Sequence, residues 1–158
     1  AEDSGVAKST LYRHWESVHE LLLDVVRANV PETHPVNLTD GFETALRAWM
    51  AQGVDALSAP DWSRVLSVMM ELRASSDAMA GVLEEDFEEQ LAAIAEILAL
   101  GVDEGRFTGP PDPRITLQGL IGPLVLAALT GEDRDHLERL ASDVLSTFLA
   151  AHPTAGSR

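Results

Sequence analysis

Apolar residues recur at steps of three and four along almost the whole of this 158-residue chain. This pattern constrains the fold more than any other feature, because a period of about 3.6 residues places the apolar side chains on one face of a helix. No stretch of useful length alternates with the two-residue period of a half-buried strand. We therefore predict an all-α fold whose helices cover residues 18–30, 41–57, 62–74, 77–104, 115–129 and 133–151.

Cap residues mark the ends of several of these predicted helices. Thr39 or Asp40 is expected to cap the second helix, and Ser76 or Asp77 the fourth. Short polar side chains suit these positions because they accept hydrogen bonds from the unpaired N–H groups of a first turn. Gly105 is expected to end the longest helix, since glycine readily adopts the left-handed backbone that terminates helices.

The composition is that of a soluble globular protein, with 46% apolar and 23% charged residues. Cysteine is absent, which excludes disulfides, thiolate metal sites and a cysteine nucleophile. No apolar run reaches the roughly 18 residues that cross a bilayer, and no secretory leader is recognisable. These features predict a cytoplasmic protein that does not bind a membrane.

Charge is unevenly distributed along the chain, whose formal net charge is −15. An acidic protein repels phosphates, so the chain as a whole does not favour non-specific binding of nucleic acid. The single lysine, Lys8, lies near the N-terminal end, whereas acidic residues crowd into the middle. The acidic residues of 84–86 and 88–89 are expected to form a solvated helix face.

The N-terminal segment combines a turn with a short helix rich in polar side chains. Gly5 is a turn residue, and Leu11 and Trp15, four residues apart, can anchor the following helix to a core. The polar residues of this helix are Lys8, Ser9, Thr10, Tyr12, Arg13 and His14. Such a helix suits the major groove of DNA, where its first residues reach base edges and its hydroxyl and basic groups reach phosphates. A solvent-exposed helix without a partner has the same composition, so both interpretations remain open on spacing alone.

The same segment resembles the recognition helix of TetR-family transcriptional regulators. The positions that match the family pattern are Gly5, Val6, Thr10, Leu11, Tyr12, His14, Trp15, Ser17 and Leu21. The resemblance implies that residues 8–10 face bases or nearby phosphates, and that Tyr12 and His14 contact the phosphate backbone. Two positions depart from the pattern. Ala7 replaces a Ser or Thr cap, and Val18 replaces a common phosphate-binding Lys or Arg, which removes one ionic contact.

The resemblance also implies how the chain is organised. Residues 1–30 would be the C-terminal part of a helix-turn-helix DNA-binding domain with its connecting helix. We expect that residues before Ala1 exist in the natural protein, because 1–4 resemble the last turn of a helix that begins earlier. Residues 31–158 would form a divergent helical ligand-binding and dimerisation domain.

An effector pocket inside residues 31–158 is a further implication of the resemblance. Methionine side chains adapt to irregular shapes and aromatic rings shape cavities, so both types are candidates for its lining. The predicted pocket residues are Trp49, Trp62, Met69, Met70, Phe87 and Leu91. Plain core packing is the alternative role for each of them, and several are expected to do both.

The last two predicted helices differ in character. Residues 115–129 are apolar nearly all round, whereas residues 133–151 are amphipathic. A helix without a polar face should be buried on every side, which in a chain of this size indicates a second copy. Each protomer would contribute these two helices to a four-helix bundle across a two-fold axis, as the resemblance also implies. The predicted interface residues are Leu120, Leu124, Leu137, Val144 and Phe148.

The sequence shows no pattern typical of a metal site or an enzyme. No two of the five histidines share a helix face at the i, i+4 spacing with an acidic residue. No nucleophile has an evident base beside it, and no glycine-rich phosphate loop is present. We therefore expect neither a metal, nor a cofactor, nor catalysis.

Together these features predict a homodimeric, ligand-responsive transcriptional regulator. We expect a repressor that binds double-stranded operator DNA and that a small apolar or amphipathic effector releases. The alternative is a helical small-molecule-binding protein without DNA binding. Replacing Lys8, Thr10 and Tyr12 distinguishes the two, because only a DNA-binding protein has affinity to lose.

Overall fold

The computed structural model describes residues 15, 18–29, 34–59, 62–73, 76–107 and 109–152. All regular secondary structure within these residues is helical, which confirms the predicted all-α fold. The helices are α2 (Val18–Asn29), a short 3₁₀ helix η1 (Leu38–Asp40), α3 (Phe42–Leu57), α4 (Trp62–Arg73), α5 (Asp77–Asp103), α6 (Pro113–Leu129) and α7 (Arg134–Ala151).

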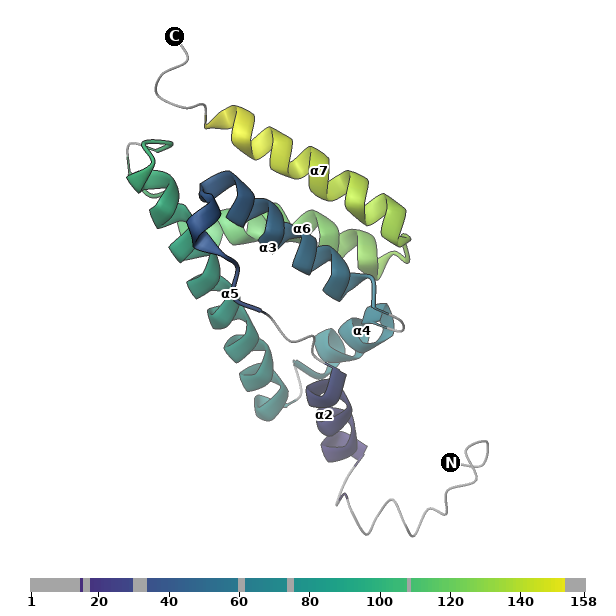
Figure 1. The fold of residues 1–158 in the computed structure, drawn as a ribbon. Coiled ribbons are helices and arrows are strands. Elements are labelled where there is room, and N and C mark those ends of the chain that lie inside the picture. The colour runs from purple at the N-terminus through teal and green to yellow at the C-terminus, as the bar shows by residue number, and fades with distance from the viewer. Residues whose placement is uncertain are drawn as a thin grey trace.

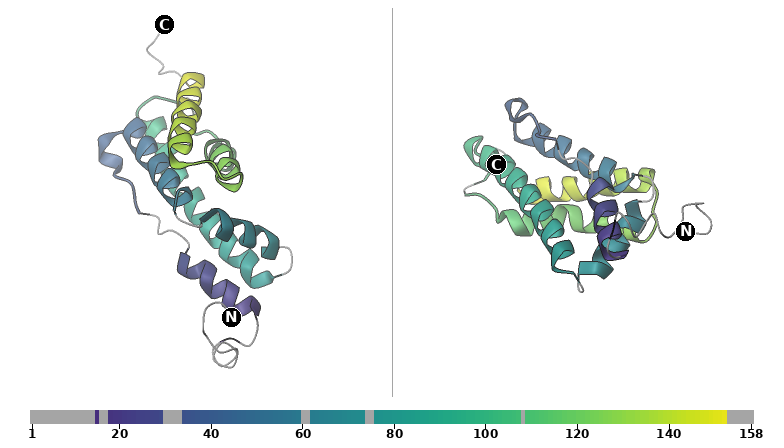
Figure 2. Two further views of the ribbon diagram at one scale, coloured as in Figure 1. Left: turned by 90° about the vertical axis from the view of Figure 1, so that its right-hand side faces the viewer. Right: turned by 90° about the horizontal axis from the view of Figure 1, so that it is seen from below.

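The helices form a bundle with α2 at one end (Figure 1). Helix α3 contacts α5, α6 and α7, and α6 also contacts α5 and α7. The long α5 extends from this group toward α2, and α4 packs on α5 and α6 along the way. Helix α2 contacts α4 and α5 and lies far from α7, as the side view in Figure 2 also shows. Helix α2 is therefore connected to the bundle through α4 and α5.

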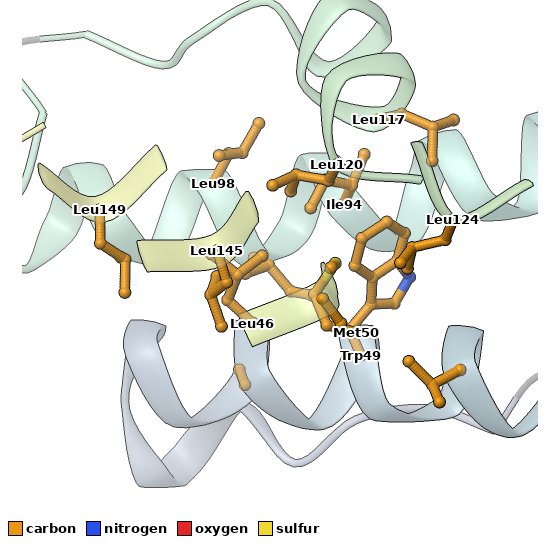
Figure 3. Close-up of a cluster of buried hydrophobic side chains, with 14 of the residues drawn as sticks. Leu46, Trp49, Met50, Ile94, Leu98, Leu117, Leu120, Leu124, Leu145 and Leu149 are labelled. Atoms are coloured by element: carbon orange, nitrogen blue, oxygen red, sulfur yellow. The ribbon is translucent and has the colours of Figure 1, made fainter. Parts of the chain in front are cut away.

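The larger hydrophobic cluster of the described residues, here called the main core, joins α3, α5, α6 and α7. Leu46 of α3, Leu98 of α5 and Leu124 of α6 are all fully buried in it (Figure 3). Leu145 and Leu149 of α7 are also buried in this cluster. Burying each such side chain contributes about 1.5–3 kcal/mol, so the main core supplies most of the driving force for folding.

A smaller hydrophobic cluster, here called the α2 cluster, holds α2 against α4 and α5. Val26 of α2 is 1% exposed and belongs to one cluster with Trp62 and Met69 of α4 and Met79 of α5. Leu57 packs against both this cluster and the main core. The position of α2 therefore depends on the same α4 side chains that face the rest of the bundle.

The predicted cap of α3 was wrong. Thr39 and Asp40 belong to η1, where both hydrogen-bond to the side chain of Asn37, and Gly41 occupies the N-cap with φ +88°. Glu104, which follows α5, accepts the N–H of Phe42 at 2.9 Å instead. A Cβ at position 41 would lie 3.2 Å from the Glu104 carboxylate, so glycine leaves room for this contact.

The remaining caps follow from local sequence. Ser76 caps α5 by accepting the N–H of Met79, as predicted, and Asp112 and Asp133 cap α6 and α7 in the same way. Gly105 has φ +72° just beyond α5, which confirms that this glycine ends the helix. Asp112 lies before Pro113, so α6 begins two residues earlier than predicted.

Aromatic side chains fill the end of the main core near the end of α5. The ring of Phe107 packs edge-on against Phe42, with 5.2 Å between centroids, and also contacts His152. Gly101 of α5 lies directly under these rings, because a Cβ there would be 2.5 Å from Phe107 and 2.9 Å from Phe42. The packing of α5 against the start of α3 therefore requires glycine at position 101.

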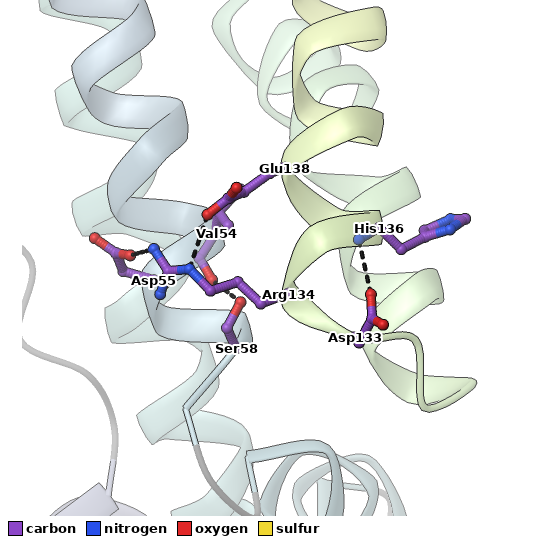
Figure 4. A network of polar contacts seen from close by, with 7 residues as sticks. All are labelled: Val54, Asp55, Ser58, Asp133, Arg134, His136 and Glu138. Carbon is purple, nitrogen blue, oxygen red and sulfur yellow. Dashed lines mark hydrogen bonds and ion pairs between the residues drawn. The ribbon is translucent and has the colours of Figure 1, made fainter.

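Polar contacts at the surface join the end of α3 to the start of α7 (Figure 4). Arg134 forms ion pairs with Asp55 of α3 and with Glu138 of its own helix. The pKa of the Arg134 guanidinium is raised above its ordinary value. The main cause is the hydrogen bonds that it donates to these two carboxylates, and their negative charge adds a smaller effect. The side chains are about half exposed, so their contribution to stability is small.

Candidate functional site

A cavity of about 200 Å³ lies between the main core and the α2 cluster. Its lining comes from α3, α4, α5 and α6, together with His34 ahead of η1. The lining residues are His34, Trp49, Gln52, Gly53, Ala56, Leu57, Trp62, Leu66, Met69, Leu83, Asp86, Glu89, Gln90, Ala93, Leu117, Ile121 and Val125. An apolar cavity of about 150 Å³ is enough to bind benzene, so this one has room for a small organic molecule.

Helical periodicity explains why these side chains converge. Helix α6 presents Leu117, Ile121 and Val125 at four-residue steps, and α4 presents Trp62, Leu66 and Met69 at steps of four and three. Gly53 opens the α3 side, where an added Cβ would lie 3.0 Å from the side chain of Ile121. The space exists because four helices meet there, with small residues on α3.

One wall of the cavity is acidic and belongs to α5. Asp86, Glu89 and Gln90 share a helix face and line the cavity together. Asp86 is half-buried, and this burial, together with the charge of Glu89, raises the pKa of the Asp86 carboxyl. The expectation that the acidic run is a solvated face was therefore wrong for Asp86, because α5 turns this residue toward the bundle.

Hydrogen bonds fix part of the polar lining. The indole N–H of Trp49 donates to Oε1 of Gln90 at 3.2 Å, and the backbone N–H of His34 donates to Oε1 of Gln52 at 3.2 Å. Trp62 differs, because its indole nitrogen is buried without a hydrogen-bond partner among the described residues. An unpaired N–H in a buried site carries a desolvation cost that a hydrogen-bond acceptor on a ligand would remove.

The structure brings half of the predicted pocket residues together. Trp49, Trp62 and Met69 line the cavity. Met70 is 47% exposed on the outer side of α4. Phe87 and Leu91 pack against the main core away from the cavity, and Phe87 carries the guanidinium of Arg114 over its ring at 4.6 Å.

The polar lining residues were not predicted, although the sequence contains a signal for them. Apolar residues of α5 recur from Leu83 to Ile97, and Asp86 and Gln90 interrupt that face at the helical period. A polar residue at a position that the period assigns to the interior is a candidate for ligand contact. The contributions of Gln52 and His34 have no comparable signal, since they depend on how α3 packs.

The predicted interface residues lie in two different environments. Leu120, Leu124 and Leu137 are at most 2% exposed and belong to the main core of a single chain. Val144 and Phe148 instead line an open groove of about 640 Å³ between α6 and α7, beside Ile115 and Gly119 of α6.

One face of α6 is exposed and apolar in the single chain, although we expected this helix to be buried all round. Ile115 is 69%, Leu126 64% and Leu129 38% exposed, and the intervening Gly119 and Gly122 are also exposed. These positions share a face at helical spacing. We call this surface the α6 face.

The predicted DNA-contacting residues, Lys8, Ser9, Thr10, Tyr12, Arg13 and His14, lie outside the described residues, as does most of the motif around them. Trp15 closes that motif and is described. Its indole N–H donates to the Asp24 carboxylate of α2 at 2.8 Å. Trp15 is thus joined to the helix whose position depends on Trp62 and Met69.

Among the described residues, no helix is both long and apolar enough to span a membrane. In the same residues, no three His, Asp or Glu side chains gather closely enough to hold a metal ion.

Comparison with known proteins identifies the domain that contains the cavity. Residues 36–144 match the family described as tetracyclin repressor-like, C-terminal domain. This match covers α3 to α6 completely and the first part of α7, and thus most of the cavity lining. No curated protein matches the chain. On the strength of the family match, this chain belongs to the TetR family of transcriptional regulators.

Proposed function

We propose that this protein is a repressor that binds operator DNA and releases it when a small apolar or amphipathic molecule enters the cavity. One observation carries the proposal: Trp62 and Met69 line the cavity and also belong to the cluster that holds α2. The alternative is a ligand-binding protein without DNA binding. It does not explain why the two side chains that line the cavity also hold α2. Regulators of this family are generally not enzymes, and the proposal assigns no catalytic role.

The coupling from cavity to DNA runs through packed side chains. A ligand that displaces Trp62 or Met69 disturbs their packing with Val26 of α2. Asp24 of α2 accepts a hydrogen bond from the indole N–H of Trp15, which follows directly on the predicted DNA-contacting residues. We assume that the protein exchanges between a conformation that fits the operator and one that does not. A ligand shifts this equilibrium only by the difference between its affinities for the two conformations. The effector would therefore bind more tightly to the conformation that does not fit the operator.

A second copy of the chain would cover the α6 face. Ile115 lines the groove together with Val144 and Phe148, and Leu126 and Leu129 continue the same exposed face along α6. Two copies related by a two-fold axis would bury it in a four-helix bundle. The dimer would then present two recognition helices to half-sites about one helical turn apart, or a multiple of it. Operator binding places the protein in the cytoplasm.

The dimer is tested by Leu126→Glu, which puts a charge on the α6 face while leaving the main core intact. We expect monomers by light scattering after size-exclusion chromatography, with unchanged far-UV circular dichroism. Met70→Glu is the matched control, because Met70 is also exposed and apolar but lies on α4. A Leu126→Glu protein that remains dimeric would refute the proposed surface.

DNA binding is tested with the full-length protein and the DNA upstream of its own gene. We expect sequence-specific binding by fluorescence anisotropy that weakens steeply with salt, and its loss when Lys8, Thr10 and Tyr12 are replaced. Compounds that raise the melting temperature in a thermal-shift screen should then release the DNA. The proposal fails if the protein shows no specific DNA affinity, or if bound compounds leave that affinity unchanged.

The site of the effector is tested by filling the cavity. Ala93 of α5 lines it, whereas the neighbouring Ala92 is exposed. We expect Ala93→Leu to abolish release by the compound and to preserve DNA binding without it, and Ala92→Leu to behave as the wild type. Equal responses of the two variants would place the effector elsewhere.

A further inference from the structure

The charge of the cavity narrows the chemistry of its ligand. Asp86 and Glu89 contribute two carboxylates, and no Lys or Arg occurs among the described residues that line the cavity. In the described part of the chain neither carboxylate forms an ion pair. His34 is the only other titratable residue in the lining. A ligand anion would face these charges without a compensating cation, at a cost that rises in a partly buried site.

Several acids outside the cavity have an arginine partner, which Asp86 and Glu89 lack in the described part of the chain. Glu43 and Glu138, on the outside of the bundle, pair with Arg47 and Arg134. Glu88, one residue from Glu89, pairs with Arg114 on the side of α5 that faces away from the cavity. Asp86 and Glu89 differ from surface acids that are unpaired among the described residues, such as Glu84 and Glu85, in that they line the cavity together.

Trp62 provides a second, independent indication that the cavity takes a polar ligand. This residue is 8% exposed, lines the cavity, and has an indole N–H without a hydrogen-bond partner among the described residues. Trp49 lies in the same lining, so two indole rings accompany the two carboxylates. Indole rings and carboxylates both attract organic cations, the rings through their π faces.

We propose that the effector is a small organic cation whose apolar body carries a hydrogen-bond acceptor. Its ammonium group would be held at Asp86 and Glu89, its acceptor at the Trp62 N–H, and its rings or alkyl chain against Trp49 and the α6 side chains. This inference rests on the proposed function, because it assigns a chemical class to the same cavity. The raised pKa of Asp86, caused by burial and then by Glu89, agrees with a carboxylate that gains a favourable partner when a cation binds.

The test compares three probes of similar size by isothermal titration calorimetry at pH 7 with the 158-residue chain. They are 2-phenoxyethylamine, which is cationic, 2-phenoxyethanol, which is neutral, and phenoxyacetate, which is anionic. A charge-assisted hydrogen bond should favour the cation over the neutral probe by about tenfold in Kd. Asp86→Asn with Glu89→Gln should remove this preference while preserving binding of 2-phenoxyethanol. Binding of the neutral probe also shows that the double variant is folded.

Glu85→Gln is the control, because Glu85 is exposed on α5 and does not line the cavity, and its replacement removes one negative charge where the double variant removes two. The cation preference should survive in this variant. Equal affinity for all three probes, tighter binding of phenoxyacetate, no binding of any probe, or an equal loss in Glu85→Gln would each overturn the inference.

The two proposals fail in different ways. Should neutral molecules bind and release operator DNA from the full-length protein, the repressor proposal stands and the cationic ligand class is wrong. Should 2-phenoxyethylamine bind in a manner that depends on Asp86 and Glu89 yet leave DNA affinity unchanged, the ligand class stands and the repressor proposal is wrong.

Discussion

Replacing Gly101 with alanine should destabilise the protein, although the same change normally stabilises a helix. Alanine is favoured over glycine in a helix interior by about 1 kcal/mol. At position 101, however, the new Cβ would lie 2.5 Å from the Phe107 ring and 2.9 Å from the Phe42 ring. Overpacking of this kind costs about 1–3 kcal/mol, and both rings are already buried in contact with each other. Subtracting the helix gain from this cost leaves a net loss of up to about 2 kcal/mol.

The same helix supplies the control. Gly81 of α5 is exposed, and an added Cβ there would meet nothing within 4 Å. Gly81→Ala should therefore raise the free energy of unfolding by about 0.5–1 kcal/mol. For a chain of this length 1 kcal/mol corresponds to about 2–4 °C, so the two variants should melt on opposite sides of the wild type. Thermal and urea unfolding followed by circular dichroism measure both. If Gly101→Ala stabilises the protein as much as Gly81→Ala, the described packing at the end of α5 is incorrect.

Three further predictions concern polar groups. Asp86→Asn should raise the melting temperature at pH 7, because burial and then Glu89 raise the pKa of Asp86 and so disfavour its charged form in the folded state. In the folded wild type the Asp86 carboxyl keeps its proton to a higher pH than in the unfolded chain. The free energy of unfolding of the wild type therefore falls as the pH rises from 3.8 through the raised pKa. The gain from Asp86→Asn should accordingly vanish below pH 3.8. Glu104→Ala removes the acceptor for the Phe42 N–H and should lower the melting temperature by about 2–4 °C, whereas Glu104→Gln retains an acceptor and should recover most of the loss. Arg134→Ala should change the melting temperature little in 0.15 M salt, because its ion pairs are solvent-exposed, and a large decrease would contradict this assignment.

Most of the fold could be predicted from the sequence, because the helices and most of their ends are determined locally. Ser76 caps α5 through a residue three positions away, and Gly105 ends the same helix through its own backbone preference. The start of α3 could not be predicted in this way. Its acceptor is Glu104, which lies 62 residues from Phe42 and reaches it only after α5 has packed.

The site was predicted less completely than the fold. Aromatic and methionine side chains identified Trp49, Trp62 and Met69, but the same criterion also selected Met70, which α4 turns to solvent. Residue type indicates what a side chain can do, whereas its direction depends on the rotation of each helix against its neighbours. Asp86 was missed because an acidic run was treated as one surface, although an α-helix turns by about 100° per residue and distributes such a run over several faces.

Because the hydrophobic interior is divided into two clusters, we expect α2 to unfold locally while the main core stays folded. The α2 cluster buries few side chains, and Leu57 is shared with the main core. Amide hydrogens of α2 should therefore exchange through a partial opening that leaves α3, α6 and α7 protected. A molecule in the cavity contacts both clusters and alters the cost of separating them. Hydrogen exchange of α2 would then report cavity occupancy from a distance, without operator DNA and without knowledge of the natural ligand.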